Sequence, residues 1–191
     1  MKVIAFNGSP RKDGNTSRMI AKLFEPLKAE GIETEVFQLG GTNIHGCRAC
    51  YACSKNRNRK CAYDDDVFNE CITKMAEADG IVLASPTYVS DVTPEIKCLI
   101  DRACLVGRSS GDMFRRKVGA AVVAVRRGGE IHAFDSINHF FFIMQMVVPG
   151  SCYWNMGIGR DKGEVEKDAE GMRTMQILGE NMAWVMKRLH G

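Results

Sequence analysis

Four of the eight cysteines lie close together in the sequence, at spacings that suit a metal centre. Cys47, Cys50, Cys53 and Cys61 form the pattern C-x2-C-x2-C-x7-C. Three thiolates in a compact loop and a fourth that folds back can bind the iron corners of a 4Fe-4S cluster. The same residues can instead hold a tetrahedral zinc ion, or form a loop of reduced thiols without metal. The spacing predicts a ligand set rather than a disulfide framework, and it leaves these three alternatives open.

The start of the chain carries the pattern of a cradle for an anion. The apolar run Val3–Phe6 predicts a short strand, and the apolar spacing from Ile20 to Leu27 predicts an amphipathic helix. Between them lies a polar loop that offers hydroxyls, a guanidinium and unpaired backbone N–H groups at a helix N-terminus. The candidate phosphate-binding residues in this loop are Ser9, Arg11, Asn15, Thr16 and Ser17. The alternative is an ordinary polar turn in which Thr16 or Ser17 caps the helix.

Two later loops carry residues that suit a planar aromatic ligand. After the apolar run Ile81–Ala84, Pro86 ends a predicted strand and Tyr88 can present an aromatic face to a ring. After Val118–Val125, two arginines supply positive charge and two glycines permit close approach of the backbone. The candidate residues in these loops are Pro86, Thr87, Tyr88, Val89, Arg126, Arg127, Gly128 and Gly129. Each loop alone is typical of a plain turn, but with the phosphate cradle they favour a flavin.

The elements that position these loops alternate between strands and helices. Five short apolar runs predict the strands, and several lack polar alternation, as expected for strands that are covered on both faces. These runs are Val3–Phe6, Val36–Leu39, Ile81–Ala84, Val118–Val125 and Met146–Val148. The alternation predicts an α/β fold, with a doubly wound five-stranded parallel sheet in a three-layer α/β/α sandwich. In such a sheet ligands bind at the carboxyl ends of the strands, so the three loops should meet.

These motifs resemble those of a known family. The stretch G-S-P-R-K-D-G-N-T is similar to the phosphate loop of the NADPH-dependent FMN reductase superfamily, whose fold is flavodoxin-like. The S-P-T-Y stretch followed by Lys97, Asp101 and Arg102 resembles the family's P-x-Y…K…D-R signature, and we interpret these three residues as structural. The cysteine segment resembles the compact motif of the iron-sulfur flavoproteins, in which four such residues hold a 4Fe-4S cluster. The resemblance implies FMN and, in the cysteine loop, a 4Fe-4S cluster as cofactors.

Composition limits the class of protein. A chain of 191 residues, 45% hydrophobic and 26% charged, predicts one flavodoxin-like FMN-binding domain over 1–191, with an inserted cysteine-rich loop at about 45–64. No apolar run reaches the roughly 18 to 20 residues that span a bilayer, so we expect no membrane and a cytoplasmic location. The net charge of +3 argues against a dedicated nucleic-acid-binding protein.

The segment from Ile131 to Met146 predicts contact with another subunit. Its second half is apolar nearly all round, which is typical of a helix deep in a core or covered by a partner. The resemblance implies homodimers or homotetramers, and we expect the stretch Phe140 to Met144 to be covered in them. We expect the remaining cysteines to be small buried hydrophobes; they are Cys71, Cys98, Cys104 and Cys152.

The resemblance predicts a flavin-dependent oxidoreductase of the iron-sulfur flavoprotein type, which passes electrons between FMN and the cluster. One alternative is a cluster-free NAD(P)H-dependent FMN or quinone reductase, and another is a zinc-knuckle interaction module. The electron donor is expected to be NAD(P)H or a ferredoxin, since the basic run from Lys55 to Lys60 suits an acidic carrier. No catalytic acid or base is expected, because the flavin ring performs the chemistry.

Overall fold

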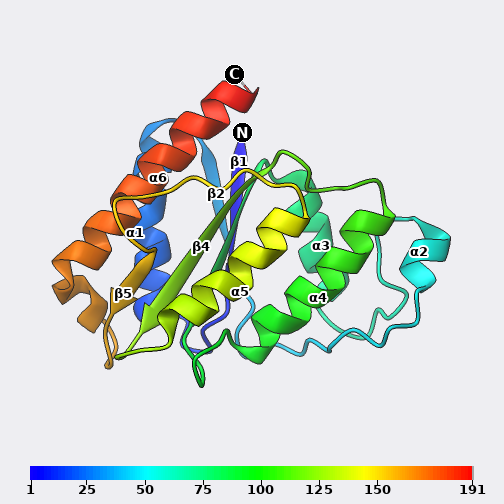
Figure 1. Ribbon diagram of the computed structural model, residues 1–191, viewed down its shortest axis with the longest axis horizontal. Coiled ribbons are helices and arrows are strands. Elements are labelled where there is room, and N and C mark those ends of the chain that lie inside the picture. Colours follow the sequence, from blue (N-terminus) through cyan, green and yellow to red (C-terminus); the bar gives the residue numbers. More distant parts are fainter. Residues whose placement is uncertain (191) are drawn as a thin grey trace.

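The computed structural model describes residues 1–190 and has a parallel five-stranded sheet at its centre (Figure 1). The strands follow the order β2-β1-β3-β4-β5, and every pair of neighbours is parallel. They span β1 (Lys2–Asn7), β2 (Glu33–Gln38), β3 (Gly80–Pro86), β4 (Val118–Val125) and β5 (Met156–Ile158). This order reverses between β1 and β3, which is the switch point where an open α/β sheet binds its ligand.

Helices cover both faces of the sheet, so the predicted three-layer α/β fold is confirmed. Helices α1 and α6 pack on one face, and α3, α4 and α5 pack on the other (Figure 1). Helix α2 lies apart from the sheet, next to α4. The helices span α1 (Asn15–Ala29), α2 (Ala52–Asn56), α3 (Phe68–Glu77), α4 (Pro94–Ser109), α5 (Glu130–Ile143) and α6 (Ala169–His190), with a short 3-10 helix, η1, at Glu164–Lys167.

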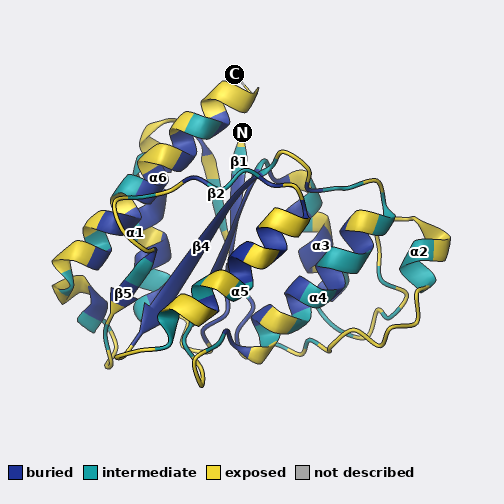
Figure 2. Ribbon diagram, in the orientation of Figure 1, coloured by how far each residue is buried: buried dark blue, intermediate teal, exposed yellow. Residues whose placement is uncertain are grey.

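The three central strands β1, β3 and β4 are largely apolar because both of their faces are covered. All eight residues of β4 are buried, and Figure 2 draws this strand in dark blue, with exposed residues in yellow on the helices and loops around it. Along β1, Ile4 and Phe6 point into the core beneath α3 and α4, whereas Val3 and Ala5 point into the core beneath α1 and α6. A strand with two buried faces gains by carrying apolar residues without alternation. No helix within residues 1–190 is long and apolar enough to cross a membrane.

The fifth strand is not where the sequence pattern predicts it. Met146–Val148 contributes only an isolated parallel bridge, in which Val147 pairs with Val118 at the start of β4. The true β5 lies ten residues later, and it is short, with Gly157 at its centre. A Cβ on Gly157 would lie 2.6 Å from a side-chain carbon of Val165, so close packing requires glycine there. A three-residue strand with a central glycine has no apolar run for a sequence pattern to detect.

Helix α5 divides the apolar segment into a buried side and an exposed side. Phe140, Phe141 and Met144 are buried in the chain's own core. Phe142 and Ile143 are 62% and 49% exposed. The expectation that the whole stretch from Phe140 to Met144 meets another subunit is therefore wrong for its buried members, because they fill the space between α5, α4 and β4.

Gly40 allows the loop after β2 to pack directly on the loop after β1. A Cβ at this position would lie 2.3 to 2.5 Å from backbone atoms of Gly8 and Ser9, which cannot move without shifting the start of the polar loop. We expect Gly40→Ala to lower the free energy of unfolding by about 1 to 3 kcal/mol through overpacking. Chemical denaturation of the two proteins measures this loss. Gly150→Ala is the control, since nothing lies within 4 Å of a Cβ there; equal midpoints for both variants would contradict the close approach.

Candidate functional site

The carboxyl ends of β1, β3 and β4 surround a cavity of about 180 Å³. Three loops that are far apart in the sequence contribute to its lining, as the position of the switch point requires. The predicted residues that line it are Ser9, Arg11, Asn15, Thr16, Pro86, Thr87, Tyr88 and Arg126. The predicted residues Ser17, Val89, Arg127, Gly128 and Gly129 do not line it. The structure thus brings together most of the residues that the sequence singled out.

The polar loop after β1 ends at the start of α1, and its backbone N–H groups are available to an anion. Gly14 is the N-cap residue and no side chain caps the helix, so Thr16 and Ser17 lie within the first turn and do not act as caps. Within residues 1–190, the N–H groups of Asn15, Thr16 and Ser17 have no hydrogen-bond acceptor. Free N–H groups and the positive end of the helix dipole favour an anion at this position.

Buried polar contacts hold this loop in shape. The Asn7 side chain accepts a hydrogen bond from the Ser9 N–H at 3.1 Å, and its amide donates to Gln38 at 2.9 Å. The Ser9 hydroxyl accepts from the Arg11 N–H at 3.2 Å. The Gln38 amide also donates to the Ser9 carbonyl, at 2.6 Å. These contacts hold the loop in this shape without a ligand, and such preorganisation lowers the entropic cost of binding.

The loop after β3 presents an unpaired hydroxyl and an aromatic ring beside the cavity. The Thr87 hydroxyl oxygen is buried and has no hydrogen-bond partner among the described residues. A buried polar atom without a partner is costly, so its place on the cavity wall fits a polar ligand. Tyr88, 46% exposed, lines the same cavity and offers the face or edge of its ring.

A tight turn follows Tyr88 and points Val89 away from the cavity. Tyr88 and Asp91 exchange two backbone hydrogen bonds, of 2.8 and 3.0 Å, and Val89 and Ser90 between them have φ of 47° and 63°. This left-handed conformation is unusual for a β-branched residue, and the Val89 side chain is fully exposed. The turn re-aims the chain after Tyr88, and Val89 does not reach the site.

Asp91 ties this turn to α5. Burial by itself raises the pKa of the Asp91 carboxyl, but hydrogen bonds from the Val92 N–H and the Ser136 hydroxyl outweigh it and lower the pKa below its usual value.

Gly129, with φ of 89°, packs against Ser90, where a Cβ would come within 2.6 Å of the hydroxyl oxygen. Gly129 therefore brings two loops together and does not itself line the cavity.

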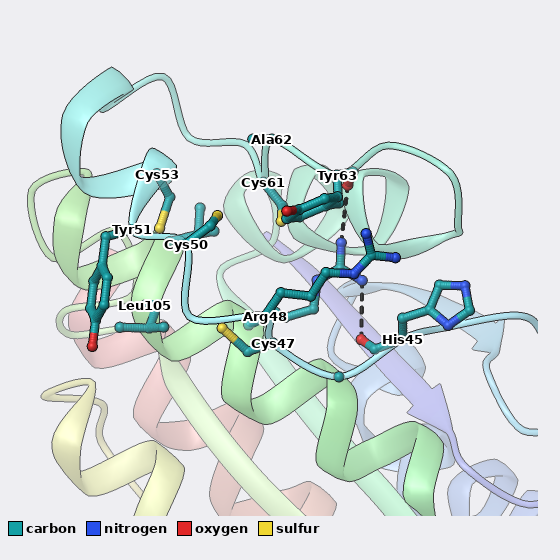
Figure 3. Close-up of a pocket in the computed structure, with 13 residues that line it drawn as sticks. His45, Cys47, Arg48, Cys50, Tyr51, Cys53, Cys61, Ala62, Tyr63 and Leu105 are labelled. Carbon is teal, nitrogen blue, oxygen red and sulfur yellow. Dashed lines mark hydrogen bonds between the residues drawn. The ribbon is translucent and has the colours of Figure 1, made fainter.

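The four predicted cysteines surround a second hollow, beside α2 and α4 (Figure 3). Cys47 and Cys50 are exposed on a stretch without regular structure, and Cys53 and Cys61 are partly buried against the core. No three of the four sulfur atoms lie within 4.8 Å of one another, a statement that covers residues 1–190. The four thiols thus face one small space from several sides.

The backbone of the cysteine loop also donates one hydrogen bond to a cysteine sulfur. Ala49 and Tyr51 adopt the left-handed conformation, with φ of 50° and 55°. The Ala49 N–H donates a hydrogen bond to the Cys47 sulfur at 3.4 Å. Hydrogen bonds from backbone N–H groups to ligand sulfurs are one of the features by which proteins hold and tune iron-sulfur clusters.

Residues 1–161 match the family of NADPH-dependent FMN reductases. An iron-sulfur flavoprotein of Methanocaldococcus jannaschii is 38% identical over 194 residues, an alignment that covers 98% of each chain. The chain belongs to the NADPH-dependent FMN reductase family, in its iron-sulfur flavoprotein branch. Membership in this family identifies the chain as a flavin-dependent oxidoreductase with FMN as its cofactor.

Further relatives and solved structures agree with this family and fold. An iron-sulfur flavoprotein of Methanosarcina thermophila is 33% identical over 189 residues, covering 98% of this chain and 96% of that protein. The structure of RosB with a bound riboflavin-phosphate intermediate superposes with a TM-score of 0.79 at 20% identity, over 99% of this chain and 80% of that chain. An archaeal flavodoxin superposes with a TM-score of 0.63 at 17% identity, over 98% and 99%. The flavodoxin-like fold predicted from the sequence is confirmed.

Because the sequence pattern placed the fifth strand at Met146–Val148, it missed two residues that line the cavity. Gly159 and Arg160 follow the true β5 and line the cavity together with Arg11 and Arg126. The Asn15 side-chain oxygen accepts hydrogen bonds from the N–H groups of Gly163, at 2.9 Å, and Val165, at 3.4 Å, which fixes this loop against α1. A correct position for β5 would have pointed to this loop, because ligands of this FMN reductase fold lie at strand ends.

The cysteines outside the loop do not share one environment. Cys71 is buried in the core, and burial raises the pKa of its thiol to about 12. Cys98 and Cys104 are half-buried on α4. The expectation of burial is wrong for Cys152, which is exposed in the segment between α5 and β5, where it lies 3.6 Å from the Thr174 hydroxyl.

Proposed function

We propose that this chain is an electron-transfer flavoprotein that binds FMN in the 180 Å³ cavity and a 4Fe-4S cluster at Cys47, Cys50, Cys53 and Cys61. The observation that carries the proposal is the convergence of these four thiols on one hollow, in a chain whose strand-end loops form a separate cavity with an anion site. When bound, FMN exchanges electrons singly or in pairs, and a 4Fe-4S cluster exchanges single electrons.

The phosphate of FMN would be held by the first turn of α1. The free N–H groups of Asn15, Thr16 and Ser17 point along the helix axis toward the loop, and the Thr16 hydroxyl and the Arg11 guanidinium line the cavity. Charged donors strengthen hydrogen bonds to a phosphate about twofold over neutral ones. The N–H groups of this turn would orient the phosphate, and the positive charge of Arg11 would offset its negative charge.

The flavin ring would lie over the loops after β3 and β4. Tyr88 can cover one part of the ring, and the unpaired Thr87 hydroxyl can donate to one of its polar atoms. Arg126 brings positive charge to the same cavity. These side chains orient the ring and keep water from part of it, and no acid or base among them is required for electron transfer.

The separation of the thiols favours a cluster over a zinc ion, and the hollow would have to widen to hold one. In a tetrahedral zinc site with Zn–S bonds of about 2.3 Å the sulfur atoms lie roughly 3.8 Å apart. Here no three thiols of residues 1–190 come within 4.8 Å, and a cubane spaces its ligands more widely than a single ion does. The hollow itself measures about 20 Å³, so the loop must open to admit a cluster. The stretch from Gly46 to Cys50, which has no regular structure, can move more easily than a helix or strand.

An acidic electron carrier fits the surface next to the cysteines. Lys55, Arg57, Arg59 and Lys60 are all exposed on and after α2. Such a patch steers an acidic partner, for example a ferredoxin, to the point where a cluster would exchange electrons. The alternative donor is NAD(P)H at the FMN cavity, where Arg11, Arg126 and Arg160 provide more positive charge than one phosphate requires.

Metal and flavin analysis of anaerobically purified protein tests the proposal. We expect stoichiometric FMN together with iron and sulfide at about four of each per chain. If a ferredoxin reduces the protein and NAD(P)H does not, an acidic carrier is favoured as the electron donor. Stoichiometric FMN without iron would overturn the cluster and leave a flavin reductase driven by a nicotinamide, and zinc in place of iron would make the loop a structural site.

The exposed side of α5 supports a homodimer or homotetramer. Phe142, Tyr153 and Trp154 are each more than half exposed around a groove of about 560 Å³. Aromatic side chains gathered on one surface are typical of an interface between subunits. We expect light scattering to give at least twice the chain mass of 21.2 kDa, and Phe142→Glu to shift the mass toward the monomer. A parent protein that stays at 21.2 kDa at micromolar concentration would contradict this.

A further inference from the structure

Arg102 is a buried charge on the wall of the cysteine hollow. Its side chain is 3% exposed, although arginine is almost never buried without a partner. It forms an ion pair with the fully buried carboxylate of Asp66 and stacks 4.1 Å over the ring of Phe68. From the sequence we interpreted Arg102 as structural, and the structure shows which groups its guanidinium contacts.

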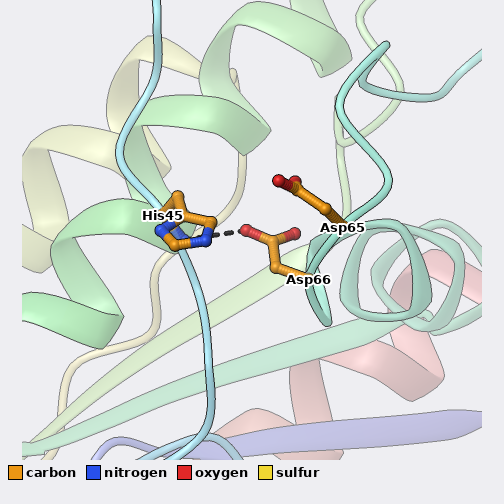
Figure 4. A group of neighbouring side chains, drawn as sticks. All are labelled: His45, Asp65 and Asp66. Carbon is orange, nitrogen blue, oxygen red and sulfur yellow. Dashed lines mark hydrogen bonds between the residues drawn. The ribbon is translucent and has the colours of Figure 1, made fainter.

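The Arg102 guanidinium joins the two ends of the cysteine loop. It donates hydrogen bonds to the His45 carbonyl at 3.2 Å and to the Tyr63 carbonyl at 3.1 Å. Figure 3 draws both as dashed lines that end at the labelled residues His45 and Tyr63. His45 lies just before Cys47, and Tyr63 lies just after Cys61. Asp66 strengthens the junction, because its carboxylate accepts a hydrogen bond from the His45 N–H at 2.8 Å (Figure 4). One ion pair therefore fixes both ends of the loop that carries the four thiols.

We infer that Arg102 is a positioning residue for the cysteine loop, and that its charge raises the reduction potential of the cluster in that loop. The inference rests on the proposed function. Arginine stays protonated at any pH that the protein survives, so its charge is permanent. Because it is buried, water screens it little. A nearby positive charge favours the cluster state that carries one more electron, and net charge and hydrogen bonds are among the factors that set such potentials.

Asp66 acts in the opposite direction on the same potential. Burial alone raises the pKa of its carboxyl, but hydrogen bonds from Arg102 and from the His45 and Phe68 N–H groups outweigh it and lower the pKa below the usual value. The carboxylate is therefore charged and offsets part of the Arg102 charge. His45, Asp65 and Asp66 bring ligand atoms within 4.8 Å of one another, but Asp66 is already engaged by Arg102, so we assign this group to the clamp and not to a cation.

The experiment compares the parent protein with four single-residue variants. Arg102→Gln removes the clamp and its charge, Arg102→Lys keeps the charge but loses the forked contact to two carbonyls, and Asp66→Asn removes the opposing charge. Arg108→Gln is the control, because it removes a positive charge from the same helix at an exposed position. The readouts are the midpoint potential of the iron centre, followed by electron paramagnetic resonance during a redox titration, and trypsin cleavage of the metal-free protein.

The two readouts separate charge from position. We expect a lower potential for Arg102→Gln, a higher one for Asp66→Asn, and potentials close to that of the parent for Arg102→Lys and Arg108→Gln. Trypsin should cut the basic stretch Lys55–Lys60 several times faster in both Arg102 variants than in the parent. If Arg102→Gln does not fold, trypsin cleavage of Arg102→Lys still tests the clamp, and the potential of Asp66→Asn tests whether a charge of this ion pair affects the iron centre.

Two results would overturn the inference. One is an iron centre whose potential is the same in the parent, Arg102→Gln and Asp66→Asn. The other is a loop that trypsin cuts at the same rate in the parent and both Arg102 variants. A parent protein without iron would refute the proposed function and the effect on potential together, and the trypsin comparison of the metal-free proteins would then decide on the clamp alone.

Discussion

Replacing Cys50 with serine is expected to abolish the iron centre while leaving the flavin in place. The anaerobically purified parent should show a broad brown absorption near 400 nm that bleaches on reduction, and the variant should lack it, with iron and sulfide falling from about four per chain to near zero. A serine hydroxyl is a poor replacement for a thiolate ligand. Without the fourth thiolate one iron of the cluster is exposed to solvent, and the cluster is lost.

The choice of Cys50 keeps this result free of folding effects. Cys50 is exposed and lies outside the hydrophobic core, whereas Cys53 and Cys61 pack against it. FMN content should not change, because the loops that line the 180 Å³ cavity follow other strands. Cys152→Ser is the matched control, since Cys152 is also exposed but does not line the cysteine hollow. A Cys50→Ser protein that keeps its iron would remove Cys50 from the ligand set.

Removing two donors from the polar loop is expected to weaken FMN binding by tens to hundreds of times. Arg11→Ala removes a charged contact to the phosphate, and Thr16→Val removes a hydroxyl while preserving the volume of a side chain that is 1% exposed. Together they should cost about 2 to 4 kcal/mol of binding free energy. Fluorescence titration of the flavin-free protein with FMN measures the change directly.

Two comparisons make this result specific to the phosphate. Lys12→Ala removes an adjacent exposed charge that does not line the cavity, so its FMN affinity should stay near that of the parent. Riboflavin lacks the phosphate, so the double variant and the parent should bind it with similar affinity. If the double variant binds FMN as tightly as the parent does, the phosphate lies outside this loop.

Several parts of the molecule could be predicted from sequence because each is encoded locally. A short unalternated apolar run rich in valine, such as Val118–Val125, favours a strand covered on both faces, and β4 has that span. The polar loop from Ser9 to Ser17 sits between a strand and a helix, so the free N–H groups of the helix start follow from local geometry. The cysteine spacing likewise requires no knowledge of the fold.

Other parts were decided only by tertiary structure. Val89 and Arg127 belong to the predicted loops, but a turn with two left-handed residues and the packing of Gly129 on Ser90 direct them away from the cavity. Arg160 enters the cavity because β5 forms at Met156–Ile158, where pairing with β4 and the close approach of Val165 decide the position. Neither choice leaves a pattern in the sequence.

Arg102 marks the boundary between what the sequence by itself determined and what only the tertiary structure decided. The sequence determined that a basic residue follows Asp101 on the helix after the third predicted strand, and it identified the four candidate ligands. Only the folded chain brings the Arg102 guanidinium against Asp66 and against carbonyls at both ends of the cysteine loop. The physical reason is that buried hydrogen bonds and ion pairs depend on residues far apart in the chain, whereas helix and strand patterns depend on neighbours.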